Sequence, residues 1–180
     1  TLALWKQHAQ LPQQCHKMVT LLKTEKLITP ATVWKKMQQS FANGHVYSLG
    51  KILNDLPKSE RRFAHKWYHN LKNPDYFLKS LSHYKKHPQG EFLIMASLIT
   101  LAKPKPHSAI ELFEKVKLEK VLTQNSINHI ERAIAISLAR EYDQEALQRL
   151  FTLSEHNDTS LQWLCRTLLK QQHWGPLLKV

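Results

Sequence analysis

Short breaks divide this chain into segments whose apolar residues recur at helical spacing. The breaks lie at Leu11-Pro12, Thr29-Pro30, Asn43-Gly44, Leu56-Pro57, Asn73-Pro74, His87-Pro88, 103–106, 141–143 and 156–158. Between them the pattern predicts helices near 2–9, 13–24, 30–43, 46–56, 59–72, 74–86, 89–102, 107–117, 125–141, 144–153, 158–172 and 174–179. Because the loops are short, consecutive helices must be antiparallel neighbours.

Pairs of these helices recur about every thirty residues, a spacing typical of helical-repeat proteins. The pairs span 30–56, 59–86, 89–117, 125–153 and 158–179. Only four glycines and few β-branched runs also favour an all-α protein. The sequence therefore predicts an all-α, right-handed α-superhelix of short antiparallel helix hairpins, forming a single domain over residues 1–180. A compact helical bundle is the structural alternative.

Several predicted helices carry signals at their ends. Thr29 can cap the helix that follows it, Pro30 fits the first helical position, and Gly44 offers a left-handed exit. Ser108 and Glu111 stand three residues apart in a capping-box pattern, which predicts the start of another helix.

Two segments carry more apolar surface than a lone helix can bury. In the first, Val33, Met37 and Phe41 line one face and Trp34 widens it. We expect that row to pack within its own hairpin and the Trp34 side to pack on the adjacent hairpin. The segment at 125–141 is apolar over most of its circumference, which predicts a central helix.

The formal net charge of +12 predicts affinity for polyanions, whether nucleic acid, an anionic lipid surface or an acidic wall polymer. A solvated lysine-rich surface without a specific partner is the alternative. No stretch is apolar for long enough to predict a membrane span, and no signal peptide is visible. The chain starts at Thr1, without an initiating methionine, so we expect a fragment of a longer polypeptide.

The sequence predicts no active site and no metal centre. His65 and His69 are four residues apart, as are His83 and His87, but neither pair belongs to a metal-binding motif with a third ligand. A nucleophile elbow, a catalytic cysteine context and a glycine-rich phosphate loop are all absent from the sequence. We therefore assign no catalytic, metal-binding or cofactor-binding residue.

Basic residues are interleaved with aromatic ones in two regions, a pattern found where sugar rings or bases stack. Core aromatic residues on an amphipathic helix give the same pattern and are its commonest cause. Trp67 is expected in the core, whereas Tyr68 and Tyr84 are expected to be exposed. The candidate contact surface consists of Arg61, Arg62, Lys66, Tyr68, Tyr84, Lys85 and Lys86.

Several stretches, taken in order, resemble the helical part of the soluble lytic murein transglycosylases. They are Cys15 with the leucine-rich helix after it, "LITPATVWKKMQQSFANG" at 27–44, "LNDLP" at 53–57, Trp67, "NP" at 73–74, "ERAIAISLARE" at 131–141, "DQEAL" at 143–147 and "LQWLCRTLLKQQHWGPLL" at 161–178. Their order and spacing carry the resemblance over most of the chain.

The resemblance implies a periplasmic enzyme with a long α-superhelix and a separate C-terminal lysozyme-like domain. That domain cleaves the β-1,4 bond between N-acetylmuramic acid and N-acetylglucosamine and leaves a 1,6-anhydro end. The family's catalytic glutamate lies in a Glu-Ser dipeptide, and no glutamate of this chain is followed by serine. We therefore expect a non-catalytic scaffold whose partners are anionic glycan strands of peptidoglycan and the catalytic domain of the same parent chain. The candidate contact surface would then bind glycan.

The resemblance also implies that Cys15 forms a disulfide with a residue outside this chain. Cys165 has no role implied by the family, and no disulfide between the two cysteines is expected. Two other functions stay open: a helical-repeat adaptor for a protein partner, and, less favoured, a basic helical repeat that binds nucleic acid.

Overall fold

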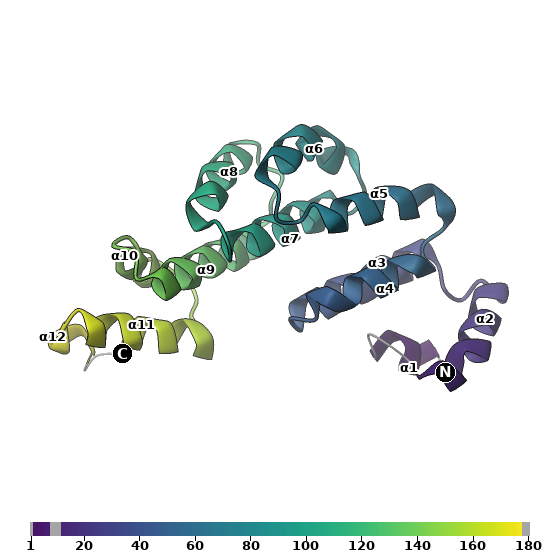
Figure 1. Ribbon diagram of the computed structural model, residues 1–180, viewed down its shortest axis with the longest axis horizontal. Coiled ribbons are helices and arrows are strands. Elements are labelled where there is room, and N and C mark those ends of the chain that lie inside the picture. Colours follow the sequence, from purple (N-terminus) through teal and green to yellow (C-terminus); the bar gives the residue numbers. More distant parts are fainter. Residues whose placement is uncertain (1, 8–11, 178–180) are drawn as a thin grey trace. The chain divides into compact units, whose positions relative to one another are not determined.

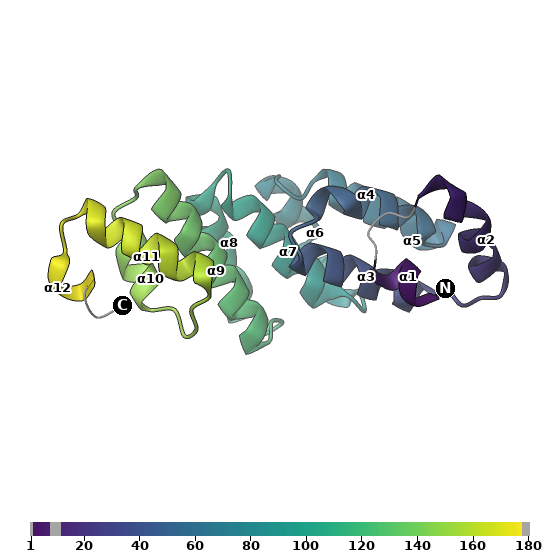
Figure 2. The ribbon, with the colours of Figure 1, turned by 90° about the horizontal axis from the view of Figure 1, so that it is seen from below.

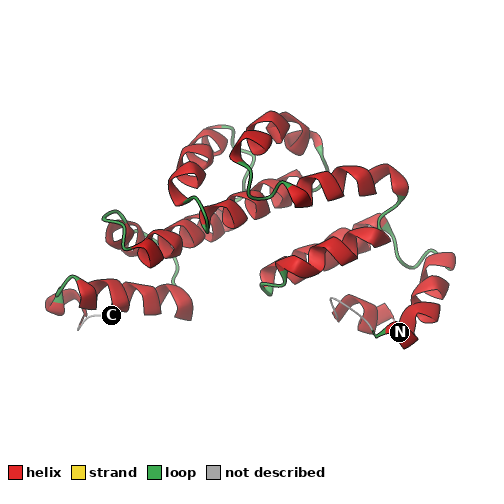
Figure 3. Cartoon of the chain, viewed as in Figure 1, coloured by secondary structure: helices red, strands yellow, loops and turns green. Residues whose placement is uncertain are grey.

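The computed structural model describes residues 2–7 and 12–177. Helices and turns account for this part of the chain, and it contains no strand (Figure 3). The predicted all-α class is therefore confirmed. Contacts group the chain into two compact units, Thr1–Asn70 and Leu71–Val180. The expectation of a single superhelical domain over 1–180 stays a prediction, and the two units are described separately.

Within the first unit the elements are α1 (Leu2–Gln7), η1 (Gln13–Cys15), α2 (His16–Thr24), α3 (Pro30–Ala42), η2 (Val46–Ser48), α4 (Leu49–Ile52), η3 (Leu53–Asp55) and α5 (Lys58–His69). The second unit contains α6 (Pro74–Lys86), α7 (Gly90–Ala102), α8 (Pro106–Leu118), α9 (Gln124–Glu141), α10 (Ala146–Phe151), α11 (Asp158–Lys170) and α12 (Trp174–Leu177). Nearly every predicted helix is present. The helix predicted at 46–56 is present as a continuous helical stretch made of η2, α4 and η3. Parts of the helices predicted at 2–9 and 174–179 lie outside the described residues.

Helix α3 forms the centre of the first unit. Its start follows the predicted chemistry, because the Thr29 side chain accepts a hydrogen bond from the backbone N–H of Thr32 and Pro30 occupies the first turn. The end of α3 also matches the prediction, because Gly44 adopts a φ of 78° in the left-handed region.

Both apolar rows of α3 are buried, as predicted. Val33 and Met37 are fully buried, and Trp34 is 3% exposed. Trp34 lies 6.5 Å from Trp67 of α5, measured between ring centroids, and its Nε1 donates a 2.8 Å hydrogen bond to Glu60. The second apolar row therefore packs on the next hairpin, and the expected core position of Trp67 is confirmed because its side chain is 0% exposed.

The second unit is built around α7 and α9. Helix α9 packs against α7, α8, α10 and α11, which confirms its predicted central position. Figure 1 shows α6 and α8 along the same side of these two helices. The helix predicted at 107–117 begins at Pro106, with Lys105 before it, so the predicted capping box at Ser108 is wrong. Proline at the first position sets the helical φ one turn earlier than the serine would.

The carboxylate of Glu91, on α7, caps the start of α9. It accepts hydrogen bonds from the Thr123 backbone N–H (2.8 Å), the Thr123 hydroxyl (2.5 Å) and the Ser126 hydroxyl (2.6 Å). Burial disfavours the charged carboxylate and by itself would raise the pKa of Glu91. The hydrogen bonds from Ser126 and Thr123 favour the charged form more strongly, so the pKa lies below its ordinary value. A negative charge at a helix N-terminus is also stabilised by the helix dipole.

Helix α7 approaches the end of α6 closely at Gly90. A Cβ atom at position 90 would lie 2.2 Å from the backbone oxygen of Tyr84. Since that oxygen belongs to the backbone, it cannot move aside as a flexible side chain would. Glycine is therefore required for the turn between α6 and α7.

Among the helices that the structure describes, none combines the length and the apolarity needed to cross a bilayer.

Candidate functional site

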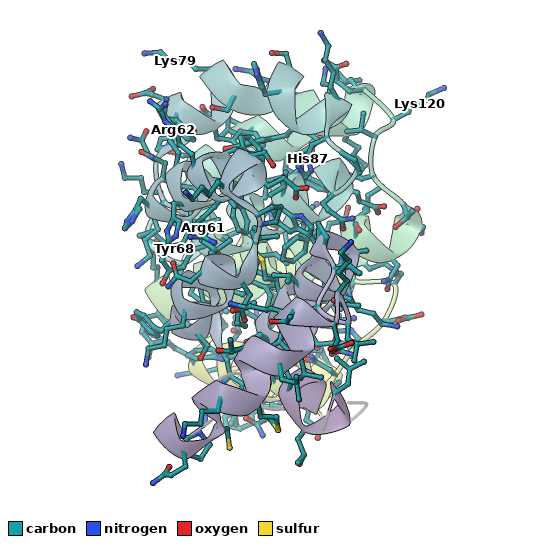
Figure 4. The ribbon with its side chains drawn as sticks, turned by 90° about the vertical axis from the view of Figure 1, so that its right-hand side faces the viewer. Arg61, Arg62, Tyr68, Lys79, His87 and Lys120 are labelled. Carbon is teal, nitrogen blue, oxygen red and sulfur yellow. The ribbon has the colours of Figure 1, made fainter. Side chains whose placement is uncertain are left out.

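Helix α5 supplies four of the seven candidate contact residues, and its two faces differ sharply. Ala64 and Trp67 are buried on the inner face. Arg62 and Lys66 are exposed, and Figure 4 shows Arg62 directed away from the ribbon. The helix therefore presents basic side chains to solvent because its aromatic inner face anchors it to α3.

Arg61 has a structural role in addition to its charge. Its Nε and Nη2 atoms donate hydrogen bonds of 3.0 and 2.7 Å to the carbonyl oxygen of Leu56. That carbonyl stands between η3 and α5, so the guanidinium group closes the turn. Part of the donor capacity of Arg61 is therefore already used within the fold.

Tyr68 forms an aromatic surface together with Tyr47. Its ring lies over Gly50, where an added Cβ would come within 3.0 Å of the ring, and its hydroxyl donates a 3.4 Å hydrogen bond to the carbonyl of Tyr47. The Tyr47 side chain is 89% exposed, whereas Tyr68 is half-buried. His69 meets the Tyr68 ring edge-on, with 5.7 Å between centroids. We call Tyr47, Tyr68, Arg62 and Lys66 the α5 surface.

The two histidines of α5 lie against each other. His65 and His69 stack with their ring centroids 6.2 Å apart, and Nε2 of His65 lies 3.2 Å from the side-chain oxygen of Asn54. No group of three or more His, Cys, Asp and Glu side chains arranged to hold a metal ion occurs in residues 2–7 and 12–177.

Positive charge is concentrated in the first unit. Residues 1–70 contain eleven lysines and arginines and three acidic residues, which gives +8 of the total +12. Two of the three acids are engaged internally: Asp55 binds Lys23 at 2.7 Å, and Glu60 accepts the hydrogen bond of Trp34. The first unit therefore has little negative charge to compensate the cations of the α5 surface.

The remaining candidates lie on α6, in the second unit, so the seven candidate residues are divided between the two units. Tyr84 was expected to be exposed, and that expectation is wrong: it is 1% exposed and packs against Phe77, with 6.0 Å between centroids. Burial raises the pKa of Tyr84 above its ordinary value, Tyr76 raises it further, and a side-chain hydrogen bond with Ser80 offsets part of the rise. Position 84 shares a face of α6 with Phe77, so its ring is taken into the core.

The two lysines beside Tyr84 face solvent but differ in their contacts. Lys85 forms a 2.7 Å ion pair with Glu119, the residue that follows α8. Lys86 is exposed and forms no ion pair within the described residues. Lys86 is therefore the freer cation of this pair.

Sequence reasoning missed Tyr47, the most exposed aromatic residue of the α5 surface. Its position inside a segment predicted as one helix gave no signal of exposure, because a tyrosine at helical spacing is more often a core residue. Tyr47 lies in η2, the short 3-10 turn at the start of this segment.

Both cysteines are free thiols of intermediate exposure. Cys15 immediately precedes α2 in the first unit, and Cys165 lies on α11 in the second. The pairing of Cys15 with a residue outside this chain stays a prediction.

Comparisons with known proteins support the resemblance at the level of the fold. No protein-family model and no curated protein matches the chain. A crystal structure of an inactive mutant of the lytic transglycosylase Slt from Pseudomonas aeruginosa matches with a TM-score of 0.69 and 22% sequence identity. The match covers 93% of this chain and 28% of that structure's chain, so this chain spans less than a third of its length.

At this identity the match shows the fold and leaves the activity to be tested. Nearly the whole chain superposes on part of a lytic transglycosylase, although fewer than a quarter of the aligned residues are identical. The predicted all-α superhelical fold class is confirmed, while its right-handed sense stays a prediction. This chain has the fold of a segment of a lytic transglycosylase.

Proposed function

We propose that this chain is a non-catalytic helical scaffold of a lytic transglycosylase that acts on peptidoglycan. The observation that carries the proposal is the fold match to Slt over 93% of this chain. In the whole enzyme, cleavage of the β-1,4 bond between N-acetylmuramic acid and N-acetylglucosamine would yield 1,6-anhydro products. A cell-envelope location, specifically the periplasm, belongs to the same proposal.

The chain's contribution would be to hold glycan strands for a catalytic domain elsewhere in the polypeptide. The α5 surface supports this role. Exposed Tyr47 offers a flat apolar face for a sugar ring, while Arg62 and Lys66 offer positive charge to the carboxylates of peptidoglycan. Lys86 would add a second basic contact on α6. Since the cations are exposed, their contribution should weaken with added salt.

The experiment compares two proteins on purified peptidoglycan sacculi. The 180-residue chain alone should sediment with sacculi at low salt and release no muropeptides. The natural polypeptide that carries this segment should release muropeptides with 1,6-anhydro ends, identified by mass spectrometry.

Two results would contradict the proposal. Intact sacculi after incubation with the folded natural polypeptide would exclude the transglycosylase assignment. Release of 1,6-anhydro products by the 180-residue chain alone would exclude a non-catalytic role. If sacculi stay intact and single-stranded nucleic acid binds with a steep salt dependence, the basic helical-repeat alternative takes precedence.

A further inference from the structure

A second group of cations and aromatic rings lies in the second unit, away from the α5 surface in sequence. It joins the end of α9 to α11, which pack against each other (Figure 2). Its members are Arg140, Tyr142, Trp163, Arg166 and Lys170, which we call the α9–α11 cluster.

Two arginines of the cluster share one indole ring. The guanidinium carbon of Arg140 lies 5.7 Å from the centroid of Trp163, and that of Arg166 lies 5.0 Å from it. Both arginines are exposed, and Trp163 is half-buried. The indole therefore holds two positive charges on one small area, an arrangement that is electrostatically unfavourable unless an anion compensates it.

The third cation lies over a second ring, that of Tyr142. The Nζ atom of Lys170 lies 3.0 Å from the centroid of Tyr142, whose side chain is 62% exposed. Tyr142 ends α9 in a left-handed conformation, with a φ of 58°. For a tyrosine this conformation is uncommon and costs free energy.

Within the described residues, none of the three cations forms an ion pair with a carboxylate. Two acids close in sequence are engaged elsewhere: Asp143 binds His107 at 2.9 Å, and Glu145 binds Arg149 at 3.2 Å. Glu141 adjoins Arg140 in sequence but forms no ion pair within the described residues. The aromatic rings thus fix the cations in place, while the hydrogen-bond donors of the cations stay available to a ligand.

We propose that the α9–α11 cluster is a binding site for the carboxylate groups of an anionic polymer. A guanidinium group that stacks on a ring through its face keeps its in-plane N–H donors, which match a carboxylate in a bidentate pair. Two such groups and one ammonium can bind successive carboxylates of one polymer chain. If the proposed function holds, that polymer is the peptide-bearing strand of peptidoglycan.

The test measures binding of poly-L-glutamate to the 180-residue chain by titration calorimetry at low salt. The variant carries Arg140→Gln, Arg166→Gln and Lys170→Gln. We expect its affinity to fall by about tenfold or more, because three charge-assisted contacts are lost.

A matched control removes the same charge from elsewhere in the unit, through Lys79→Gln, Lys115→Gln and Lys120→Gln. These lysines are exposed and form no ion pair within residues 12–177. Figure 4 shows Lys79 and Lys120 projecting from the fold. The control should lose about twofold in affinity, as expected for a change in net charge alone. Equal losses in the two triple variants would overturn the proposal.

A second variant separates charge from position. Trp163→Leu keeps all three cations but removes the ring that holds the arginines, so affinity should fall by about threefold or more while net charge is unchanged. An unaltered affinity would overturn the role of the indole. Tighter, cluster-dependent binding of a single-stranded oligonucleotide than of poly-L-glutamate would overturn the assignment of carboxylates as the ligand.

The outcome is independent of the proposed function, because poly-L-glutamate contains no peptidoglycan. Loss of binding in the cluster variant, together with intact sacculi after incubation with the natural polypeptide, would support the site and refute only the enzyme. Release of 1,6-anhydro products with no effect of the cluster variant on poly-L-glutamate would refute only the site.

Discussion

The ammonium group of Lys36 lies 4.2 Å from the ring centroid of Trp5, and both side chains are buried. Trp5 also donates a 3.3 Å hydrogen bond to Asp55 through its indole nitrogen. Burial lowers the pKa of Lys36 to about 8, and the charge of Asp55 partly offsets this effect. Lys36, a charged residue of α3, is therefore part of the contact between α1 and α3.

Lys36 should make the stability of the chain depend on pH in the alkaline range. Its pKa is about 8 when folded and 10.5 when unfolded, so the unfolded state binds more protons between these values. The free energy of unfolding should therefore rise with pH across this window, by up to about 3 kcal/mol from this residue. Urea unfolding of the wild type and of Lys36→Met at pH 7.5 and 10 measures the difference.

The comparison between the two proteins isolates Lys36 from other groups that titrate at high pH. The wild type should gain stability relative to Lys36→Met on going from pH 7.5 to 10. A constant difference between the proteins would contradict the burial of the charge. Lys35→Met is the control, because Lys35 is exposed on the same helix.

Glu91→Gln should destabilise the chain at neutral pH by about 1–3 kcal/mol, because the carboxylate accepts three hydrogen bonds at the start of α9. Its folded pKa is depressed, so this stabilisation is present above pH 4.5 and is lost as pH falls through the folded pKa. Thermal unfolding of the wild type and of Glu91→Gln at pH 7 and pH 3 measures this stabilisation.

Glu114→Gln provides the matched control, since Glu114 is exposed on α8. Its free energy of unfolding should change by less than about 0.5 kcal/mol. If Glu114→Gln lowers the free energy of unfolding as much as Glu91→Gln does, the effect comes from the change in net charge and not from helix capping.

Gly90→Ala should be among the most damaging single substitutions, because its Cβ would lie 2.2 Å from the Tyr84 carbonyl oxygen. We expect a loss of about 3 kcal/mol or more in chemical denaturation. Gly175→Ala adds the same methyl group on α12, where the added Cβ would meet no atom within 4 Å beyond its own stretch of helix, and should leave stability nearly unchanged. Similar stabilities for the two variants would show that the α6–α7 turn relaxes easily.

The α5 surface predicts a loss of peptidoglycan binding in the double variant Tyr47→Ser and Arg62→Gln. Affinity of the 180-residue chain for sacculi should fall by about fivefold or more, since a stacking face and a cation are both removed. The control, Leu118→Ser with Lys115→Gln, removes an 83% exposed apolar side chain and one positive charge elsewhere. Cosedimentation with sacculi measures both, and an equal loss would argue against the α5 surface.

Sequence patterns predicted the helices well because their causes are local. Proline at 30, 74 and 106 begins three helices, and Gly44 ends one, whatever surrounds them. The apolar rows of α3 and α9 also predicted burial correctly, since each row is wider than one neighbouring helix can cover.

The candidate surface was less predictable, because exposure depends on what packs against a helix. Tyr68 and Tyr84 look alike in sequence, as aromatic residues beside basic ones. Tyr84 is nevertheless buried against Phe77, while Tyr68 lies over Gly50 and Tyr47 remains exposed beside it. The cluster of Arg140, Trp163 and Lys170 was invisible for the same reason, since its members come from two helices.

The sequence by itself therefore determined the helical segments, their order and their net charge, because backbone propensity, capping and hydrophobic spacing act within a few residues. The tertiary structure alone decided which rings are buried, how Lys36 comes to lie beneath Trp5, and which cations have no carboxylate partner among the ion pairs of the described residues. These properties depend on distances between residues far apart in the chain, which only packing fixes.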